Sequence, residues 1–330
     1  MDIKEAMRDL FIIDLFTKYG NNQQKGNFCA DGVLWFEILK RCDNNSLLRA
    51  ELTCQLFHRI LSSSQFWIEK CEYDGVALPS IQWRKYLYEK EYSKSSDPYS
   101  NGIPLPHVFD YKRICIGRPF GRNIAVTLGS HCTLDSLKQK GMRFKSGGNG
   151  IIIERPPEGI DSDEISICFT TSYGWCSRYF EIDLNKAGVQ DWIMDLIRPE
   201  ITVRERCICR RDCEAIYELQ VKLLKEHEEF DASEDYEKLE NSIYPRFRTA
   251  KRSWAEEKGK SWELVEYMFE DYPAGIRRIG VLSRGKDSRY WAGHYGSKFG
   301  ATEVRIKLPD NPRMLALDEA VDAWSTYVDC

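Results

Sequence analysis

Residues 217–223 read Tyr-Glu-Leu-Gln-Val-Lys-Leu, so that apolar and polar side chains alternate along the stretch. The same alternation occurs in Val-Glu-Tyr-Met-Phe at 265–269 and in Val-Arg-Ile-Lys-Leu at 304–308. Successive side chains of a β-strand point to opposite faces of a sheet, so a period of two indicates strands. Turns containing Gly and Asp separate these stretches without regular intervening helices. This order favours an antiparallel β-sandwich over a parallel α/β sheet.

A helical period precedes the strands. Leu48, Leu52, Leu56 and Ile60 recur at four-residue steps, which is typical of one apolar helix face. Residues 93–106 then crowd Ser, Asp, Pro, Asn and Gly together, as in a surface connection. We therefore expect an α+β protein in two units, a small all-α module followed by an all-β antiparallel sandwich.

The composition along the chain predicts five segments. They are an N-terminal helical extension and linker (1–27), a helical module (28–75), a linker with a helix (76–110), a sandwich (111–309) and a C-terminal tail (310–330). Within the sandwich, 227–260 is expected to be a charged, partly helical insertion. In the tail, Leu317, Val321, Trp324 and Val328 would form one helical stripe. A module of roughly 45 residues is near the lower limit of independent stability and should lean on a partner.

Charge and apolar content exclude several classes of protein. The net charge is −4 with acidic and basic residues interspersed, so no field of one sign is present to hold nucleic acid or an anionic membrane. No stretch reaches the ~20 apolar residues of a membrane span. Twelve scattered cysteines in 330 residues do not require a disulfide framework. We expect no nucleic-acid partner, no membrane insertion and a reducing, cytoplasmic setting.

Two glycine-rich stretches invite a nucleotide-binding hypothesis. Gly280 to Lys286 comes close to a phosphate-binding loop, but Asp287 stands where that motif needs a hydroxyl, and 288–291 read as a strand rather than a helix. The stretch is therefore interpreted as a hairpin turn. Residues 147–150, Gly-Gly-Asn-Gly, suit a mobile turn better than a nucleotide cradle. We expect no cofactor.

Metal and catalytic motifs are incomplete. Cys207, Cys209 and Cys213 suggest zinc, but no paired C-x-x-C set accompanies them, and a C-x-C in a strand points both thiols to one face as small buried groups. The five histidines lack metal-ligand spacing and no G-x-S-x-G motif occurs. The sequence therefore predicts neither a metal site nor an enzyme.

Aromatic residues beside turns are the remaining candidates, namely Tyr173, Trp175, Tyr290, Trp291 and Tyr295. The apolar face of a sugar ring can stack on such side chains. Most aromatics of a sandwich are instead core residues. The residues alone leave both interpretations open.

Four blocks follow one another in order over about 190 residues: Thr170–Cys176 with Phe180–Leu184, Arg211–Leu224, Phe269–Arg277, and Asp287–Gly296. Together they resemble the F-box-associated (FBA) domain of the sugar-recognising F-box proteins. The resemblance implies a galactose-binding-like jelly roll.

The helical module resembles a divergent F-box. The similarity lies in Asp31–Leu34, Glu37–Leu39, Leu48 with Arg49, Cys54, and Phe66 with Trp67, while Ala30 replaces the family's proline and an extra residue stands between Val33 and Ile38. The family implies a substrate receptor of an SCF-type ubiquitin ligase. Its helices bind a Skp-type adaptor and through it a cullin, its sandwich selects the substrate, and the receptor performs no bond chemistry. Our candidate adaptor contacts are Val33, Leu34, Leu48 and Leu52.

In glycan-binding members of the family, loops grip the inner chitobiose of N-linked high-mannose chains on glycoproteins in ER-associated degradation. Tyr173, Asp212, Tyr290 and Trp291 match the family's site residues. Trp291 would stack on a sugar, Tyr290 would pack beside it, and Asp212 would accept a hydrogen bond. Ala292 stands where the family has a lysine, so chitobiose is expected to bind weakly or not at all. The alternative is an adaptor-independent, lectin-like or protein-binding sandwich with a degenerate F-box.

Overall fold

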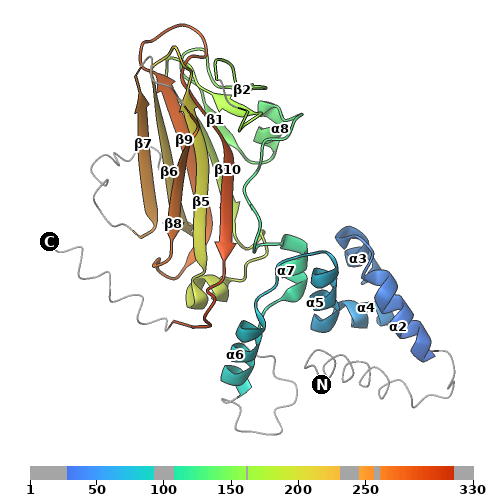
Figure 1. Ribbon diagram of the computed structural model, residues 1–330. Coiled ribbons are helices and arrows are strands. Elements are labelled where there is room, and N and C mark those ends of the chain that lie inside the picture. The colour runs from blue at the N-terminus through green and yellow to red at the C-terminus, as the bar shows by residue number, and fades with distance from the viewer. Residues whose placement is uncertain (1–27, 93–107, 161–162, 231–244, 256–260, 316–330) are drawn as a thin grey trace. The chain divides into compact units, whose positions relative to one another are not determined.

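The computed structural model describes residues 28–92, 108–160, 163–230, 245–255 and 261–315 (Figure 1). The expected N-terminal extension and the helical stripe of the tail lie outside the described residues. The chain divides into two compact units between Phe120 and Gly121. Within the described residues, no helix is both long and apolar enough to cross a membrane.

The first unit is helical, as expected. Its helices are α2 (Phe28–Leu39), α3 (Asn44–Ala50), α4 (Gln55–Leu61), α5 (Ser64–Tyr73), α6 (Ile81–Tyr92) and α7 (Tyr111–Gly117). Phe66 and Trp67 are buried, and the Trp67 indole Nε1 donates to the Leu61 carbonyl at 2.6 Å. Helix α7 packs against α5, so the compact sandwich unit begins at Gly121 rather than at 111.

The four-residue leucine pattern does not form one helix. Helix α3 ends at Ala50 and α4 begins at Gln55, so the pattern is interrupted by a turn. Ile60 is fully buried, whereas Leu48 and Leu52 are exposed. A four-residue spacing that crosses a turn no longer places its members on a single face.

The second unit is an antiparallel β-sandwich, which confirms the expected fold class. Its two five-stranded sheets have the strand orders β1-β4-β9-β6-β7 and β2-β3-β10-β5-β8, and Figure 1 shows them face to face. Helix α8 (Leu134–Gln139) precedes β1, and a π-helical turn (Ile193–Ile197) precedes β5. The strands are β1 (Arg143–Lys145), β2 (Ile152–Glu154), β3 (Cys168–Thr170), β4 (Cys176–Asp183), β5 (Glu200–Cys209), β6 (Ala215–Lys225), β7 (Phe247–Trp254), β8 (Glu263–Phe269), β9 (Ile276–Asp287) and β10 (Ser297–Lys307).

The glycine-rich stretch at 280–287 is not a hairpin turn, contrary to the sequence prediction. It is the C-terminal part of β9, which pairs with β4 on one side and β6 on the other. Gly285 serves a close approach: a Cβ there would lie 1.8 Å from the Ser297 hydroxyl oxygen. The glycine reflects tight packing between the sheets rather than a reversal of the chain. Residues 288–291, expected as a strand, are a loop.

The charged segment 227–260 contains strand β7 (Phe247–Trp254), while residues 231–244 and 256–260, on which the expected partial helix could fall, lie outside the described residues. This strand pairs with β6 and ends its sheet. Its side chains include Arg248, Lys251 and Arg252. Charged residues on an edge strand discourage pairing with other chains, and they hide the apolar signal that identifies a strand in a sequence.

Candidate functional site

The four candidate substrate residues lie on three loops of the sandwich. Tyr173 is half-buried in the β3–β4 loop and Asp212 is exposed in the β5–β6 loop. Tyr290 and Trp291, in the β9–β10 loop, have exposed fractions of 68% and 41%. These values exclude a core role for the last two rings.

Backbone hydrogen bonds join the three loops. The amide of Asp287 donates to the Ser172 carbonyl at 2.8 Å, which links the β9–β10 and β3–β4 loops. The amide of Ser288 donates to the Glu214 carbonyl at 3.0 Å, which links the β9–β10 and β5–β6 loops. The structure therefore brings the loops that carry the predicted residues to one end of the sandwich.

A fourth loop, Gly147 to Gly150, is hydrogen-bonded to the loops at this end of the sandwich. The Asn149 amide donates to the Ser172 hydroxyl at 2.9 Å, and the Asn149 side-chain oxygen accepts from the Gly293 amide at 2.8 Å. A Cβ on Gly174 would lie 2.6 Å from the backbone nitrogen of Gly148. A Cβ on Gly147, one of the glycines expected to form a mobile turn, would lie 2.7 Å from the Trp175 carbonyl oxygen, so glycines on both loops allow the two backbones to touch.

Asp287 positions the exposed aromatics, a role that the sequence analysis missed. Its buried carboxylate accepts from the amide of Arg289 at 2.9 Å and from that of Trp291 at 2.7 Å. Tyr290, between them, adopts a left-handed backbone with φ of 60°, which is uncommon for a bulky residue. An aspartate at a strand end is a known turn signal, and it could have identified this loop.

Asp212 already has a partner within its own loop. The Arg210 guanidinium Nε donates to its carboxylate at 2.7 Å. Slight burial opposes ionisation, but hydrogen bonds from its own amide, the Cys213 thiol and Arg210 hold the pKa of Asp212 below its usual value. Asp212 is therefore an ionised acceptor whose charge is compensated by Arg210.

The aromatic side chains at this end contact one another and nearby cations. The rings of Trp291 and Tyr295 meet edge to face with centroids 6.0 Å apart. The Arg289 guanidinium lies 5.6 Å from the Trp291 centroid, and that of Arg210 lies 5.2 Å from the Tyr295 centroid. This arrangement can hold a ligand by stacking and hydrogen bonding.

The cysteines that suggested zinc are buried thiols. Cys207 and Cys209 lie on β5, and Cys209 packs with Cys213 in a small apolar cluster. Burial raises the pKa of Cys207, and burial together with Asp212 raises that of Cys213 to about 12. Protonated thiols are poor metal ligands. Within the part of the chain that the structure describes, no three His, Cys, Asp or Glu side chains are grouped to hold a metal ion.

The candidate adaptor contacts lie at the surface of the helical unit. Leu52 has an exposed fraction of 87% and Leu34 one of 57%, and both Val33 and Leu48 are exposed. The sequence analysis omitted two further exposed apolar side chains of α2, Trp35 and Ile38.

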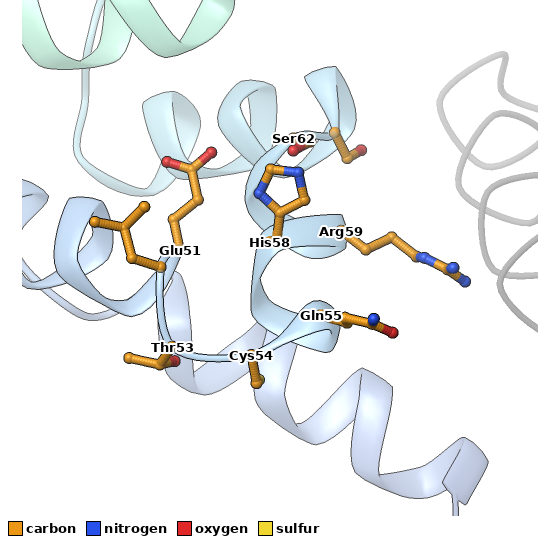
Figure 2. Close-up of a pocket in the computed structure, with 9 residues that line it drawn as sticks. Glu51, Thr53, Cys54, Gln55, His58, Arg59 and Ser62 are labelled. Atoms are coloured by element: carbon orange, nitrogen blue, oxygen red, sulfur yellow. The ribbon is translucent and has the colours of Figure 1, made fainter.

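An open hollow of about 740 Å³ includes Leu52 in its lining. Its other lining residues are almost all polar, and Figure 2 shows Glu51, from the turn after α3, and His58, from α4, among them. A hollow so open is a surface recess, and the exposed Leu52 is part of its wall.

Comparison with known proteins agrees with this architecture. The model of the F-box associated region matches residues 115–306. Human F-box only protein 17 is 30% identical over 83% of this chain and 90% of its own length. F-box only protein 6 of Rattus norvegicus is 32% identical over 71% of this chain and 75% of its own length.

Two solved carbohydrate-binding modules show only a distant likeness. TmCBM61, solved with β-1,4-galactotriose, has a TM-score of 0.32 at 7% identity over 56% of this chain and 100% of its own. The CBM22-1 xylan-binding domain from Paenibacillus barcinonensis Xyn10C has a TM-score of 0.29 at 8% identity, over 51% and 86%. Scores this low carry no argument about a ligand. The family match covers more than half of the chain, and the chain therefore belongs to the F-box only proteins that contain an F-box associated region.

Proposed function

We propose that this protein is the substrate-recognition subunit of an SCF-type ubiquitin ligase. In this role the helical unit binds a Skp-type adaptor, which joins it to a cullin, and the loop end of the sandwich binds the substrate. The receptor brings the substrate to the ligase without performing bond chemistry, in the cytoplasm.

The observation that carries the proposal is the apolar exposure of the helical unit. Leu34 and Leu52 project into solvent, although other apolar side chains of the same helices are buried. A small module that leaves such area uncovered is suited to a protein partner. Membership of the F-box only proteins supports an adaptor as that partner.

Loops joined by hydrogen bonds at one end of the sandwich support the second half of the proposal. Substrate recognition there would use Tyr173, Asp212, Tyr290 and Trp291. Loops on a rigid scaffold can vary without unfolding it. The family's glycan function suggests N-glycosylated proteins in ER-associated degradation as substrates, but Ala292 offers no donor where the family has a lysine. We therefore propose that protein surface contributes most of the substrate affinity.

An adaptor-independent, lectin-like or protein-binding sandwich is the second candidate. It is favoured by the departures of the F-box, Ala30 above all. The two candidates differ in whether the helical unit has a partner, and one binding experiment separates them.

The test is calorimetry and co-elution of the full-length protein with a purified Skp-type adaptor. Leu34→Ser and Leu52→Ser should each weaken binding about tenfold or more, as expected for contacts near an interface centre, without lowering the unfolding temperature. Ile81→Ser is the control matched to Leu34→Ser, since the exposed fraction of Ile81 (61%) is close to that of Leu34 but Ile81 belongs to α6. Separate elution with no heat signal would reject the ligase role and leave the second candidate.

A further inference from the structure

Lys286 lies among the exposed aromatic rings of the sandwich. It belongs to β9, one residue after Gly285, whose α-carbon faces Ser297 of the opposite sheet. Because successive residues of a strand face opposite sides, Lys286 lies on the outer face. Its ammonium nitrogen is 5.3 Å from the centroid of Trp175 and 5.3 Å from that of Tyr290.

Three arginines contact aromatic rings in the same region, and each also has a carboxylate partner. A bidentate contact joins Arg284 and Glu218, with nitrogen–oxygen distances of 2.9 and 3.0 Å. The other two pairs are Arg289 with Glu214 at 3.0 Å and Arg210 with Asp212 at 2.7 Å. The charge of each arginine is thereby compensated within the protein.

Lys286 differs from these arginines. Among the described residues, its ammonium group has no carboxylate within salt-bridge distance and no hydrogen-bond acceptor. Aromatic rings attract a cation but do not neutralise it. The rings therefore restrict the position of this ammonium group and leave its three N–H donors available.

The rings around Lys286 are engaged by cations. Trp175 has Lys286 near its ring and also the Arg284 guanidinium, 5.0 Å from its centroid. A sugar ring stacks on an open aromatic face, and here cations already occupy positions over the ring. A ligand that contributes a carboxylate to the free ammonium fits this surface better than one that contributes an apolar sugar face.

We propose that Lys286 is a specificity-determining residue that binds an acidic peptide segment of the substrate. The inference rests on the proposed use of the loop end for substrate recognition, and it names the substrate class of that site. The lysine donates to an Asp or Glu side chain, while Trp175 and Tyr290 hold the lysine in place and pack against the peptide. Tyr290 is well suited to the second task because it is the most exposed of these rings.

The experiment measures the fluorescence anisotropy of labelled hexaglutamate and hexaglutamine with the full-length protein. Hexaglutamate should bind more tightly, and added salt should weaken its binding because exposed charges are screened. Lys286→Gln should weaken hexaglutamate binding about tenfold, the loss of one charge-assisted contact, whereas Lys286→Arg should retain most of it. Lys307→Gln should have no effect, since Lys307 is an exposed lysine at the other end of the sandwich, paired with Asp310.

Equal affinity for the two peptides, or hexaglutamate binding unchanged by Lys286→Gln, would overturn the inference. So would Lys286-dependent binding of a sialylated trisaccharide in the absence of hexaglutamate binding. Adaptor affinity of the Lys286→Gln variant should equal that of the parent protein. Adaptor binding therefore tests the ligase role separately from the peptide result.

Discussion

The guanidinium of Arg178 on β4 donates to the carboxylate of Glu205 on β5 at 2.6 Å, and both side chains are buried. Strands β4 and β5 belong to different sheets, so this ion pair joins the two layers of the sandwich. Tyr217, Ser283 and Thr302 donate further hydrogen bonds to the same carboxylate. These bonds satisfy the Glu205 oxygens, as a buried charge pair requires, whereas the buried Arg178 Nε has no hydrogen-bond partner among the described residues.

Replacing Arg178 with Met should destabilise the sandwich by about 3–5 kcal/mol, because it leaves the Glu205 charge buried without its partner. The double variant Arg178→Met, Glu205→Leu should recover most of that loss, since it removes both charges. Urea unfolding of the full-length protein measures both. The control is Arg204→Gln, which breaks the exposed Arg204–Glu266 pair and should cost at most about 1 kcal/mol. A loss in Arg178→Met no larger than this control would contradict the prediction.

Replacing Gly174 with Ala should displace the β3–β4 loop and cost about 1–3 kcal/mol, as overpacking does. The physical reason is the 2.6 Å approach of the new Cβ to the Gly148 backbone, where no flexible side chain can move aside. Gly129→Ala is a matched control in the same unit, since its nearest atom would lie at an ordinary 3.7 Å. Unfolding midpoints compare the two variants, and equal midpoints would show that the loops do not depend on this contact.

Replacing Asp287 with Ala should release Trp291 from its position and cost about 1–3 kcal/mol, because the part-buried amides of Arg289 and Trp291 lose their acceptor. Fluorine NMR of fluorotryptophan-labelled protein reports on the ring, with its resonance assigned by Trp291→Phe. The Trp291 resonance should shift or broaden in Asp287→Ala. It should remain unchanged in Asp310→Ala, which removes an exposed carboxylate (86%). An unmoved resonance in Asp287→Ala would show that Trp291 is held by other contacts.

The stability of the sandwich should fall in alkali. Burial raises the pKa of Cys168 to about 12 and that of Tyr272 well above its ordinary value, whereas unfolded thiols and phenols titrate near pH ~8.5 and ~10. The folded state therefore keeps protons that the unfolded state loses. This stabilisation is fully present at pH values below the pKa of these groups in the unfolded protein. It is lost as the pH rises through their higher pKa in the folded protein.

Urea unfolding with reductant, from about pH 8 to 11, measures this dependence. The midpoint should decline above pH ~8.5 and more steeply above pH ~10, where phenols join the thiols. Tyr272→Phe removes one titrating group and should make the upper slope shallower, although it also loses a 2.6 Å hydrogen bond to the Pro199 carbonyl. A midpoint independent of pH over this range would contradict the assignment.

The strand patterns were readable from the sequence because they are local. Alternation at 217–223, 265–269 and 304–308 identified most of β6 and β8 and the C-terminal end of β10. Each residue's preference for one face depends on its own side chain and its near neighbours. Strand β7 escaped this reasoning because an edge strand has little apolar surface to bury.

The exposed apolar residues of the helical unit were partly predictable. Resemblance to the F-box identified Leu34 and Leu52 as surface residues in spite of their type, and the structure exposes both. The sequence around Trp35 and Ile38 has no pattern of polar residues that would show whether these side chains lie at the surface or in the core. Only the packed helices decide which apolar side chains remain uncovered.

By itself, the sequence determined the two-unit architecture, the antiparallel sandwich and the identity of the loops that carry exposed aromatics. Only the tertiary structure decided that Asn149 holds Gly293, 144 positions away, and that Asp287 holds Trp291. It also decided that the Lys286 ammonium lies near both the Trp175 and the Tyr290 rings, without a carboxylate partner among the residues that the structure describes. The reason is that sheet pairing brings distant segments to one end, and a contact between such segments leaves no periodic signal in either one.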